Sequence, residues 1–214
     1  EEVENRLKAA REMLLKQQVM MKEKKLPVIV LFEGWGAAGK GSVLGKVIKN
    51  IDPRFFKVAV MDEPTEEENR KPFLYRHFVK IPEAGKFVFM DSGWMSEVTK
   101  QKLSGELSDE DYKKRVESIK RFERQLTDNG YLLLKFFFNI DKKEQKKRLN
   151  KLKEDKNTKW RVSEYDKWQN KHYEECFDVY DQYLCDTDHS SAPWYIVDAK
   201  DKKWAQLQVL ETIV

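Results

Sequence analysis

Residues 28–43 read VIVLFEGWGAAGKGSV, and this stretch decides the fold class. The apolar, β-branched run VIVLF predicts a strand buried on both faces, and the glycine-rich turn after it leads into a helix that begins near Gly39. Such a turn binds phosphate because unpaired backbone N–H groups and the helix dipole point at one place. Glycine has no side chain, so an anion can approach the backbone closely there. The spacing of Gly34 and Gly39-Lys40 therefore predicts a phosphate-binding loop, with a merely tight turn as the alternative.

One residue departs from the usual loop pattern G-x-x-x-x-G-K-[ST]. Gly41 follows the lysine, where the pattern has a hydroxyl that binds Mg²⁺. The stretch alone therefore leaves open whether the loop is a working phosphate site or the remains of one.

Strands and helices alternate along the rest of the chain. Further strands are predicted at 55–61, 86–91, 131–140 and 192–199, and helices at 3–21, 39–50, 72–80, 108–130, 141–155, 163–184 and 201–214. Strands separated by helices of ten or more residues require right-handed crossovers. We therefore predict an α/β fold of the P-loop NTPase type, a three-layer α/β/α sandwich with a five-stranded parallel sheet.

Composition narrows the class of protein. With 214 residues, 40 % of them apolar, the chain can form one large core, so we predict a single domain over 1–214 with an N-terminal helix over 1–25. A net charge of +4 is too small to indicate a nucleic-acid partner by itself. No apolar run approaches the length of a membrane span, and Cys176 and Cys185 lie too far apart along one predicted helix to bridge. We expect a cytoplasmic protein without a membrane or nucleic-acid partner.

The amino-acid sequence resembles one family over about residues 26–205. The segments LFEGWGAAGKGS, DEPTEEENRKPFLYRHFVKIPEAGKFVFMDSGW, FERQLTDNGYLLLKFFFNIDKKEQKKRL, WRVS and TDHSSAPWYIVDAKDKK look like those of the type-2 polyphosphate kinases. In that family glycine normally follows the loop lysine, which accounts for Gly41. The resemblance is greatest to the N-terminal copy of duplicated polyphosphate:AMP phosphotransferases.

The resemblance implies roles for individual positions. The phosphate- and nucleotide-binding loop would comprise Gly34, Gly36, Ala37, Ala38, Gly39, Lys40, Gly41 and Ser42. Asp91 would be the Walker B carboxylate that holds magnesium, the implied cofactor, and Arg76 would face the substrate. A strand-end cap for Asp91, and a surface ion pair with the acidic run 62–68 for Arg76, are the alternatives.

A basic segment over about 141–163 matches the helical lid of the family. Between 142 and 161 it holds ten basic residues, among them Arg148 and Arg161, against Glu144, Glu154 and Asp155. Such an excess suits a polyanion such as polyphosphate, although a solvated helix face is the alternative.

Three positions depart from what the family usually has. Gly36 stands where the family has an aspartate, Glu63 replaces a lysine, and Ser92 replaces the arginine after the Walker B aspartate. Each change weakens the binding of metal or phosphate, and phosphoryl transfer depends on positioning and charge neutralisation.

Two functions follow from this comparison. The first is a phosphotransferase that moves a terminal phosphoryl group between polyphosphate and AMP, ADP or ATP, with Lys40, Asp91 and Arg76 as its catalytic residues. The second is an eroded domain that binds polyphosphate or supports an active partner domain. A generic P-loop kinase for a small metabolite comes third. In each case we expect either a homo-oligomer or a tandem second domain.

Overall fold

The computed structural model describes all 214 residues. Five strands alternate with helices along the chain. The strands are β1 (Val28–Gly34), β2 (Phe56–Val60), β3 (Phe87–Asp91), β4 (Leu132–Asn139) and β5 (Trp194–Asp198). The helices are α1 (Glu2–Glu23), α2 (Lys40–Ile48), α3 (Glu66–Asn69), α4 (Tyr75–Phe78), α5 (Trp94–Leu103), α6 (Asp109–Asp128), α7 (Lys142–Glu154), α8 (Glu164–Lys171), α9 (Tyr173–Thr187) and α10 (Lys202–Ile213), with short 3-10 turns η1 (Pro53–Phe55) and η2 (Lys159–Arg161).

The sheet is parallel throughout, in the order β2-β3-β1-β4-β5. The predicted fold class is therefore confirmed. β1 lies at the centre, and its register pairs Phe32 with Asp91 of β3 and with Phe136 of β4. Because the strands are parallel, their carboxyl ends lie at one edge, and the loops after β1, β3 and β4 converge there.

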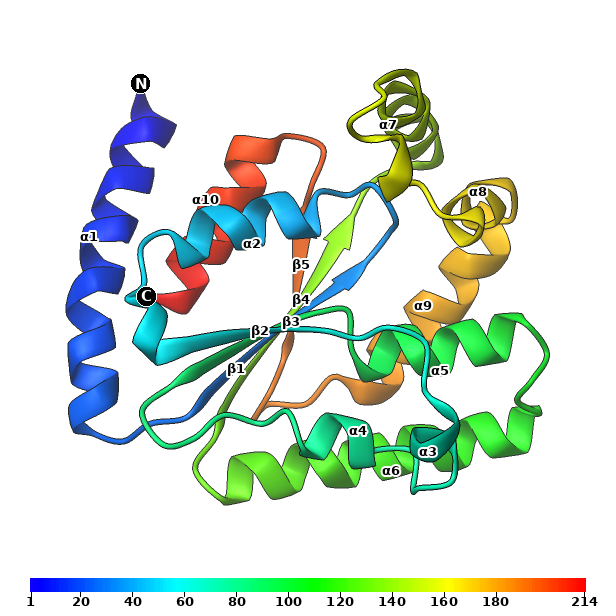
Figure 1. The fold of residues 1–214 in the computed structure, drawn as a ribbon, viewed down its shortest axis with the longest axis horizontal. Helices are drawn as coiled ribbons and strands as arrows, with labels where there is room; N and C mark the ends of the chain where they lie inside the picture. The colour runs from blue at the N-terminus through cyan, green and yellow to red at the C-terminus, as the bar shows by residue number, and fades with distance from the viewer.

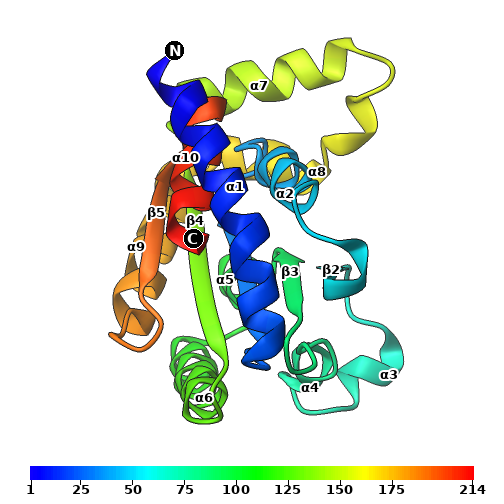
Figure 2. The ribbon, with the colours of Figure 1, turned by 90° about the vertical axis from the view of Figure 1, so that its left-hand side faces the viewer.

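Helices cover both faces of the sheet (Figure 1). α1, α2 and α10 pack together on one face, and α5, α6 and α9 pack on the other. The view turned by 90° shows α7 and α8 standing beyond the carboxyl edge, next to the start of α2 (Figure 2). The two-faced burial explains why β1 is apolar from Val28 to Phe32.

α1 docks along one apolar face, as its residue spacing predicts. Leu7, Ala10, Leu14 and Met21 are buried, and α10 is the main partner of this helix. No helix of the chain combines the length and the hydropathy that a membrane crossing requires.

Two helix predictions were wrong. The helix expected over 163–184 is interrupted at His172, whose φ of −105° and ψ of 37° lie outside the helical region, so α8 and α9 are separate. The helix expected over 72–80 forms only over Tyr75–Phe78. Helix α5 was not predicted, because its sequence has no clear start signal. The helix is stabilised instead by the burial of Trp94, Met95 and Val98 against the sheet.

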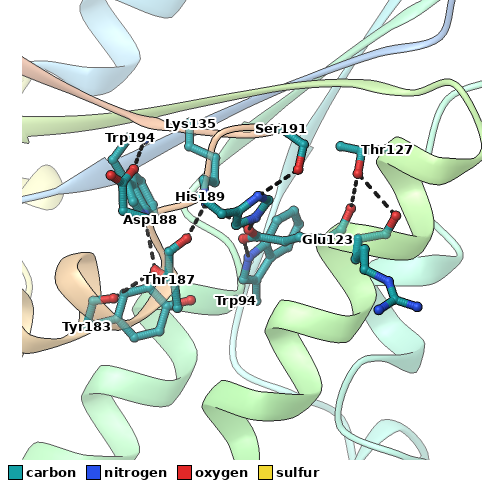
Figure 3. A network of polar contacts seen from close by, with 11 residues as sticks. Trp94, Glu123, Thr127, Lys135, Tyr183, Thr187, Asp188, His189, Ser191 and Trp194 are labelled. Carbon is teal, nitrogen blue, oxygen red and sulfur yellow. Dashed lines mark hydrogen bonds and ion pairs between the residues drawn. The ribbon is translucent and has the colours of Figure 1, made fainter.

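An ion pair is buried between the sheet and α6 (Figure 3). Lys135 of β4 and Glu123 of α6 have no exposed side-chain surface, and Nζ of Lys135 lies 2.7 Å from Oε2 of Glu123. The same carboxylate accepts hydrogen bonds from Trp94 Nε1 at 2.9 Å and from His189 Nε2 at 2.8 Å. Burial lowers the pKa of Lys135, opposed by the charge of Glu123. Such a pair fixes the position of α6 because breaking it leaves a buried charge without a partner.

Candidate active site

The loop between β1 and α2 has the backbone of a phosphate loop. At Gly34 a Cβ atom would lie 2.7 Å from Phe138 N, so β4 leaves no room for a side chain there. Gly39 adopts a left-handed φ of 96° although a Cβ atom would meet nothing within 4 Å, so conformation and not space requires glycine there. This turn aims the first N–H groups of α2 back into the loop.

Lys40 lies inside the loop that it follows. Its Nζ donates to the carbonyl oxygens of Gly34 at 3.2 Å and Trp35 at 3.1 Å. An ammonium has three N–H donors, so one remains for an anion in the cleft. Because the two carbonyls hold the charge at the loop mouth, the geometry suits contact with an outer phosphate.

Side chains from α7 and α8 hold the tip of the loop. Gly36 N donates to Gln169 Oε1 at 2.9 Å, and Gln145 Nε2 donates to Gly36 O at 3.2 Å. Next to them the buried Trp35 ring stacks on Tyr173, with centroids 4.0 Å apart. Residues of α7, α8 and α9 therefore contact the loop directly.

Asp91 ends β3 beside the start of α2. Its Oδ2 lies 3.5 Å from the position of a Cβ atom on Gly41. Ser92 then adopts a left-handed φ of 64°, and its N–H bonds Phe32 O at 2.9 Å. The carboxylate thus lies at the loop, the arrangement in which a Walker B aspartate assists magnesium binding. Ser42, also predicted for the loop, is exposed on α2.

Glu33, the last side chain before the loop, is fully buried. It accepts hydrogen bonds from Gly93 N at 2.9 Å, Ser96 N at 3.3 Å and the Ser96 hydroxyl. Burial raises its pKa to about 7, opposed by these hydrogen bonds and by Lys40. Glu33 therefore links the loop strand to the N-terminus of α5.

A cleft opens at this edge of the sheet, lined by residues of the loop, the β2–α3 turn, α5 and α8. Its charged lining is mixed: the cations are Lys40, Arg76 and Lys100, and the carboxylates are Glu33, Asp62, Glu63, Glu97 and Asp166. Glu63, which the sequence predicts to weaken phosphate binding, forms an ion pair, because Lys100 Nζ lies 2.9 Å from its Oε1. This pair brings a lysine from α5 to the β2–α3 turn.

Arg76 is buried at the far side of this cleft. It donates to the Asp62 carbonyl, and its guanidinium lies 3.9 Å from Glu68 and 3.7 Å from Glu97. Both interpretations from the sequence thus describe part of its surroundings, since it pairs with the acidic run and also lines the cleft. Its Nε is buried and has no hydrogen-bond partner.

The two arginines of the basic segment differ in position. Arg148 donates to Glu144, to the loop carbonyls of Ala37 and Ala38, and to two carbonyls before α10, those of Ala199 and Lys200. All five of its N–H groups are therefore used, and two of the five bonds hold the loop. Arg161 is exposed on η2, 5.3 Å from the ring centroid of Trp160.

The sequence missed the residues that α7 and α8 bring to the loop. Gln145, Asp166 and Gln169 lie more than 100 positions beyond Gly36, and their sequence surroundings indicate only helix positions and a cap. Glu33 carried a usable signal, because a charge inside an apolar strand run requires buried partners.

A parallel sheet with a glycine loop, its lysine and an aspartate at the adjacent strand end defines a P-loop protein of the phosphotransfer type. The family model of polyphosphate kinase 2 (PPK2) matches residues 1–214. The chain therefore belongs to the polyphosphate kinase 2 family, and the resemblance in the sequence is confirmed.

Relatives and solved structures agree with this membership. The chain is 33 % identical over 187 residues to a polyphosphate:AMP phosphotransferase of Pseudomonas syringae pv. tomato, covering 87 % of this chain and 37 % of the relative. It is 29 % identical to ADP-polyphosphate phosphotransferase 3 of Rhizobium meliloti, covering 92 % and 69 %. A crystal structure of polyphosphate kinase 2 from Arthrobacter aurescens TC1 superimposes with a TM-score of 0.92 at 27 % identity, covering 97 % of this chain and 75 % of that one.

Proposed function

We propose that this chain moves a terminal phosphoryl group between inorganic polyphosphate and a nucleoside mono- or diphosphate. The observation that carries the proposal is the position of Lys40, whose ammonium lies inside a left-handed glycine turn with one donor unused. Relatives of this chain are named as phosphotransferases between polyphosphate and AMP, ADP or GDP. The acceptor is an anionic phosphate oxygen, so the reaction needs no general base.

The residues divide the work by position. The loop amides, Lys40 and the N-terminus of α2 would hold the transferred phosphoryl group and stabilise the charge that it develops. Arg76, which also lines the cleft, would contact the second substrate through its guanidinium. The exposed basic side chains of α7 and η2, with Arg161 at the end, would attract the polyphosphate chain over a longer range.

Magnesium fits the donors at this edge. Asp91 supplies a carboxylate beside Gly41, and the chain has no cluster of three side chains that could bind a metal alone. Mg²⁺ typically binds proteins through one or two carboxylates together with substrate phosphates, so one aspartate at a phosphate loop is a sufficient anchor. When bound, the ion would neutralise phosphate charge.

We further propose that the chain is one domain of a longer protein. It spans 37 % of the Pseudomonas syringae relative and 40 % of a polyphosphate:AMP phosphotransferase of Pseudomonas aeruginosa. A tandem second domain or a second copy of the chain would then complete the assembly. A cytoplasmic location follows from the proposed substrates and stays a prediction.

A transfer assay with polyphosphate, Mg²⁺ and either AMP or ADP tests the proposal. We expect ADP or ATP to form only when all three components are present. A chain that binds polyphosphate in a salt-sensitive way, yet forms no nucleotide product with any acceptor, would instead be the binding or scaffolding domain of a larger enzyme.

A further inference from the structure

The space beside Gly36 is filled by a side chain from another helix. A Cβ atom on Gly36 would overlap Oδ1 of Asp166, and it would lie 3.0 Å from Cγ of the same carboxylate and 3.2 Å from Gln169 Oε1. Real Cβ atoms essentially never come as close as the overlap with Oδ1, so the Asp166 side chain would have to shift, and the other two contacts are tight. The absence of a side chain at position 36 therefore allows α8 to bring a carboxylate onto the phosphate loop.

One oxygen of this carboxylate is used and the other is free. Oδ2 of Asp166 accepts hydrogen bonds from Ser163 N at 2.8 Å and from the Ser163 hydroxyl at 2.7 Å, which form part of the capping box of α8. Oδ1, the oxygen against Gly36, has no protein partner. The cap fixes the orientation of the side chain, and Asp166 lines the same cleft as Lys40.

The position of α8 on the loop is also fixed. One turn after Asp166, the buried Gln169 accepts hydrogen bonds from Gly36 N at 2.9 Å and from Gln145 Nε2 at 2.7 Å. The same Gln145 amide donates to Gly36 O at 3.2 Å. Both the N–H and the C=O of Gly36 thus bond to side chains of α7 and α8, so the carboxylate of Asp166 is held next to the loop.

We propose that Asp166 is the acidic side chain of this phosphate loop: it takes the place of a side chain at residue 36 and helps to bind the divalent cation that accompanies the phosphates. The inference rests on the proposed function. A carboxylate oxygen without a partner would repel a bare phosphate, whereas it is a preferred ligand for Mg²⁺. Cation binding then depends on the docking of α8, because the ligand belongs to that helix and not to the loop.

A metal-binding measurement on the whole chain tests the proposal without turnover. Mn²⁺ is titrated with and without inorganic tripolyphosphate, and free Mn²⁺ is followed by electron paramagnetic resonance. In Asp166→Asn, which keeps the shape of the side chain, we expect Mn²⁺ affinity to fall at least tenfold. Ser163→Ala removes the hydroxyl bond but keeps the carboxylate and its bond from the Ser163 N–H, so its affinity should fall less than that of Asp166→Asn, because the ligand itself remains.

An exchange of the carboxylate between the two positions separates a role in cation binding from a role in packing. Gly36→Asp alone should weaken Mn²⁺ binding, because the new side chain meets Asp166. Gly36→Asp combined with Asp166→Ala should recover at least half of the loss in binding free energy of Asp166→Ala, since the carboxylate returns on the loop. A purely structural role of Asp166 predicts no such rescue.

The outcomes are distinguishable from those of the transfer assay. The inference is overturned if the wild type does not bind Mn²⁺, or if the wild type and Asp166→Asn bind it equally. It is also overturned if the double variant binds Mn²⁺ no more tightly than Asp166→Ala. A wild type that binds Mn²⁺ through Asp166 but transfers no phosphoryl group overturns the proposed function and supports this inference.

Discussion

Oδ2 of Asp91 lies 3.5 Å from the position that a Cβ atom would take on Gly41, so the end of β3 and the first turn of α2 form one side of the loop. This distance is ordinary van der Waals contact, and Gly41 has no left-handed φ that would exclude a side chain. A serine therefore fits at position 41, and its hydroxyl would lie beside the carboxylate. Hydroxyl and aspartate together hold Mg²⁺ in other P-loop proteins.

We predict that Gly41→Ser increases Mn²⁺ affinity in the presence of tripolyphosphate by about tenfold, which corresponds to one added contact of roughly 1.4 kcal/mol. Titration followed by electron paramagnetic resonance measures the change. Gly41→Ala is the matched control, because it gains helix propensity without a ligand atom. Equal affinities of the serine and alanine variants would contradict this assignment of Asp91.

Glu33 should make stability depend on pH. Its pKa is raised from 4.5 to about 7 by burial, so between these values only the folded state retains the proton. The free energy of unfolding therefore loses a contribution of about 3 kcal/mol as the pH rises through this window, and it has the full contribution below the window.

Glu33→Gln keeps the shape of the side chain and removes its titration. Denaturant unfolding at pH 5, 6, 7 and 8 should show a smaller loss of stability with rising pH in the variant than in the wild type. If the two chains lost the same stability across that range, the carboxyl group would titrate near its ordinary value and its burial would not matter.

The buried pair of Lys135 and Glu123 should tolerate joint but not single replacement. Lys135→Met leaves a buried carboxylate without its ammonium partner, and we expect a loss of about 3–5 kcal/mol in the free energy of unfolding. Lys135→Met with Glu123→Gln should recover part of that loss, because no charge then stays buried. Urea unfolding measures both, and a single variant as stable as the double variant would show that the pair is not coupled.

The basic segment should act through its number of charges. Lys143, Lys146 and Lys153 are exposed and have no ion-pair partner. Replacing all three by alanine should reduce the slope of log K for polyphosphate binding against log salt by about 2, at roughly 0.7 per contact. The matched control replaces Lys16 of α1, Lys24 just after α1 and Lys113 of α6, all of them exposed. A slope equally reduced in the control would show that only net charge matters.

The sequence predicted the parts of the site that are local in the chain. The strand before Gly34, the turn at Gly39 and the five-stranded parallel sheet all follow from residue order and spacing. The break at His172 was not predicted, because the buried residues of α8 and α9, Gln169 among them, satisfy a helical period on both sides of it. On either side of the break, Gln169 and Tyr173 contact the loop, and a local sequence pattern does not encode such contacts.

The candidate site shows the same limit. From the sequence alone, Gly36 indicates the loss of a metal ligand, because glycine has no side-chain oxygen. The structure places a carboxylate from α8 in the space beside it. Glu63 likewise read as a lost lysine, and Lys100 of α5 pairs with it. Both compensations join residues at least 37 positions apart in the chain, a separation at which local pattern carries no information.

The most direct test of the central claim compares phosphoryl transfer by the wild type and Lys40→Ala, with polyphosphate, Mg²⁺ and AMP or ADP. Lys40 is partly exposed and bonds only to loop carbonyls, so the variant should fold with nearly unchanged stability. We expect kcat/KM to fall by about 10³ or more, the typical effect of removing a group that stabilises transition-state charge. Equal kcat/KM values for the two chains would contradict the claim that this loop performs the transfer.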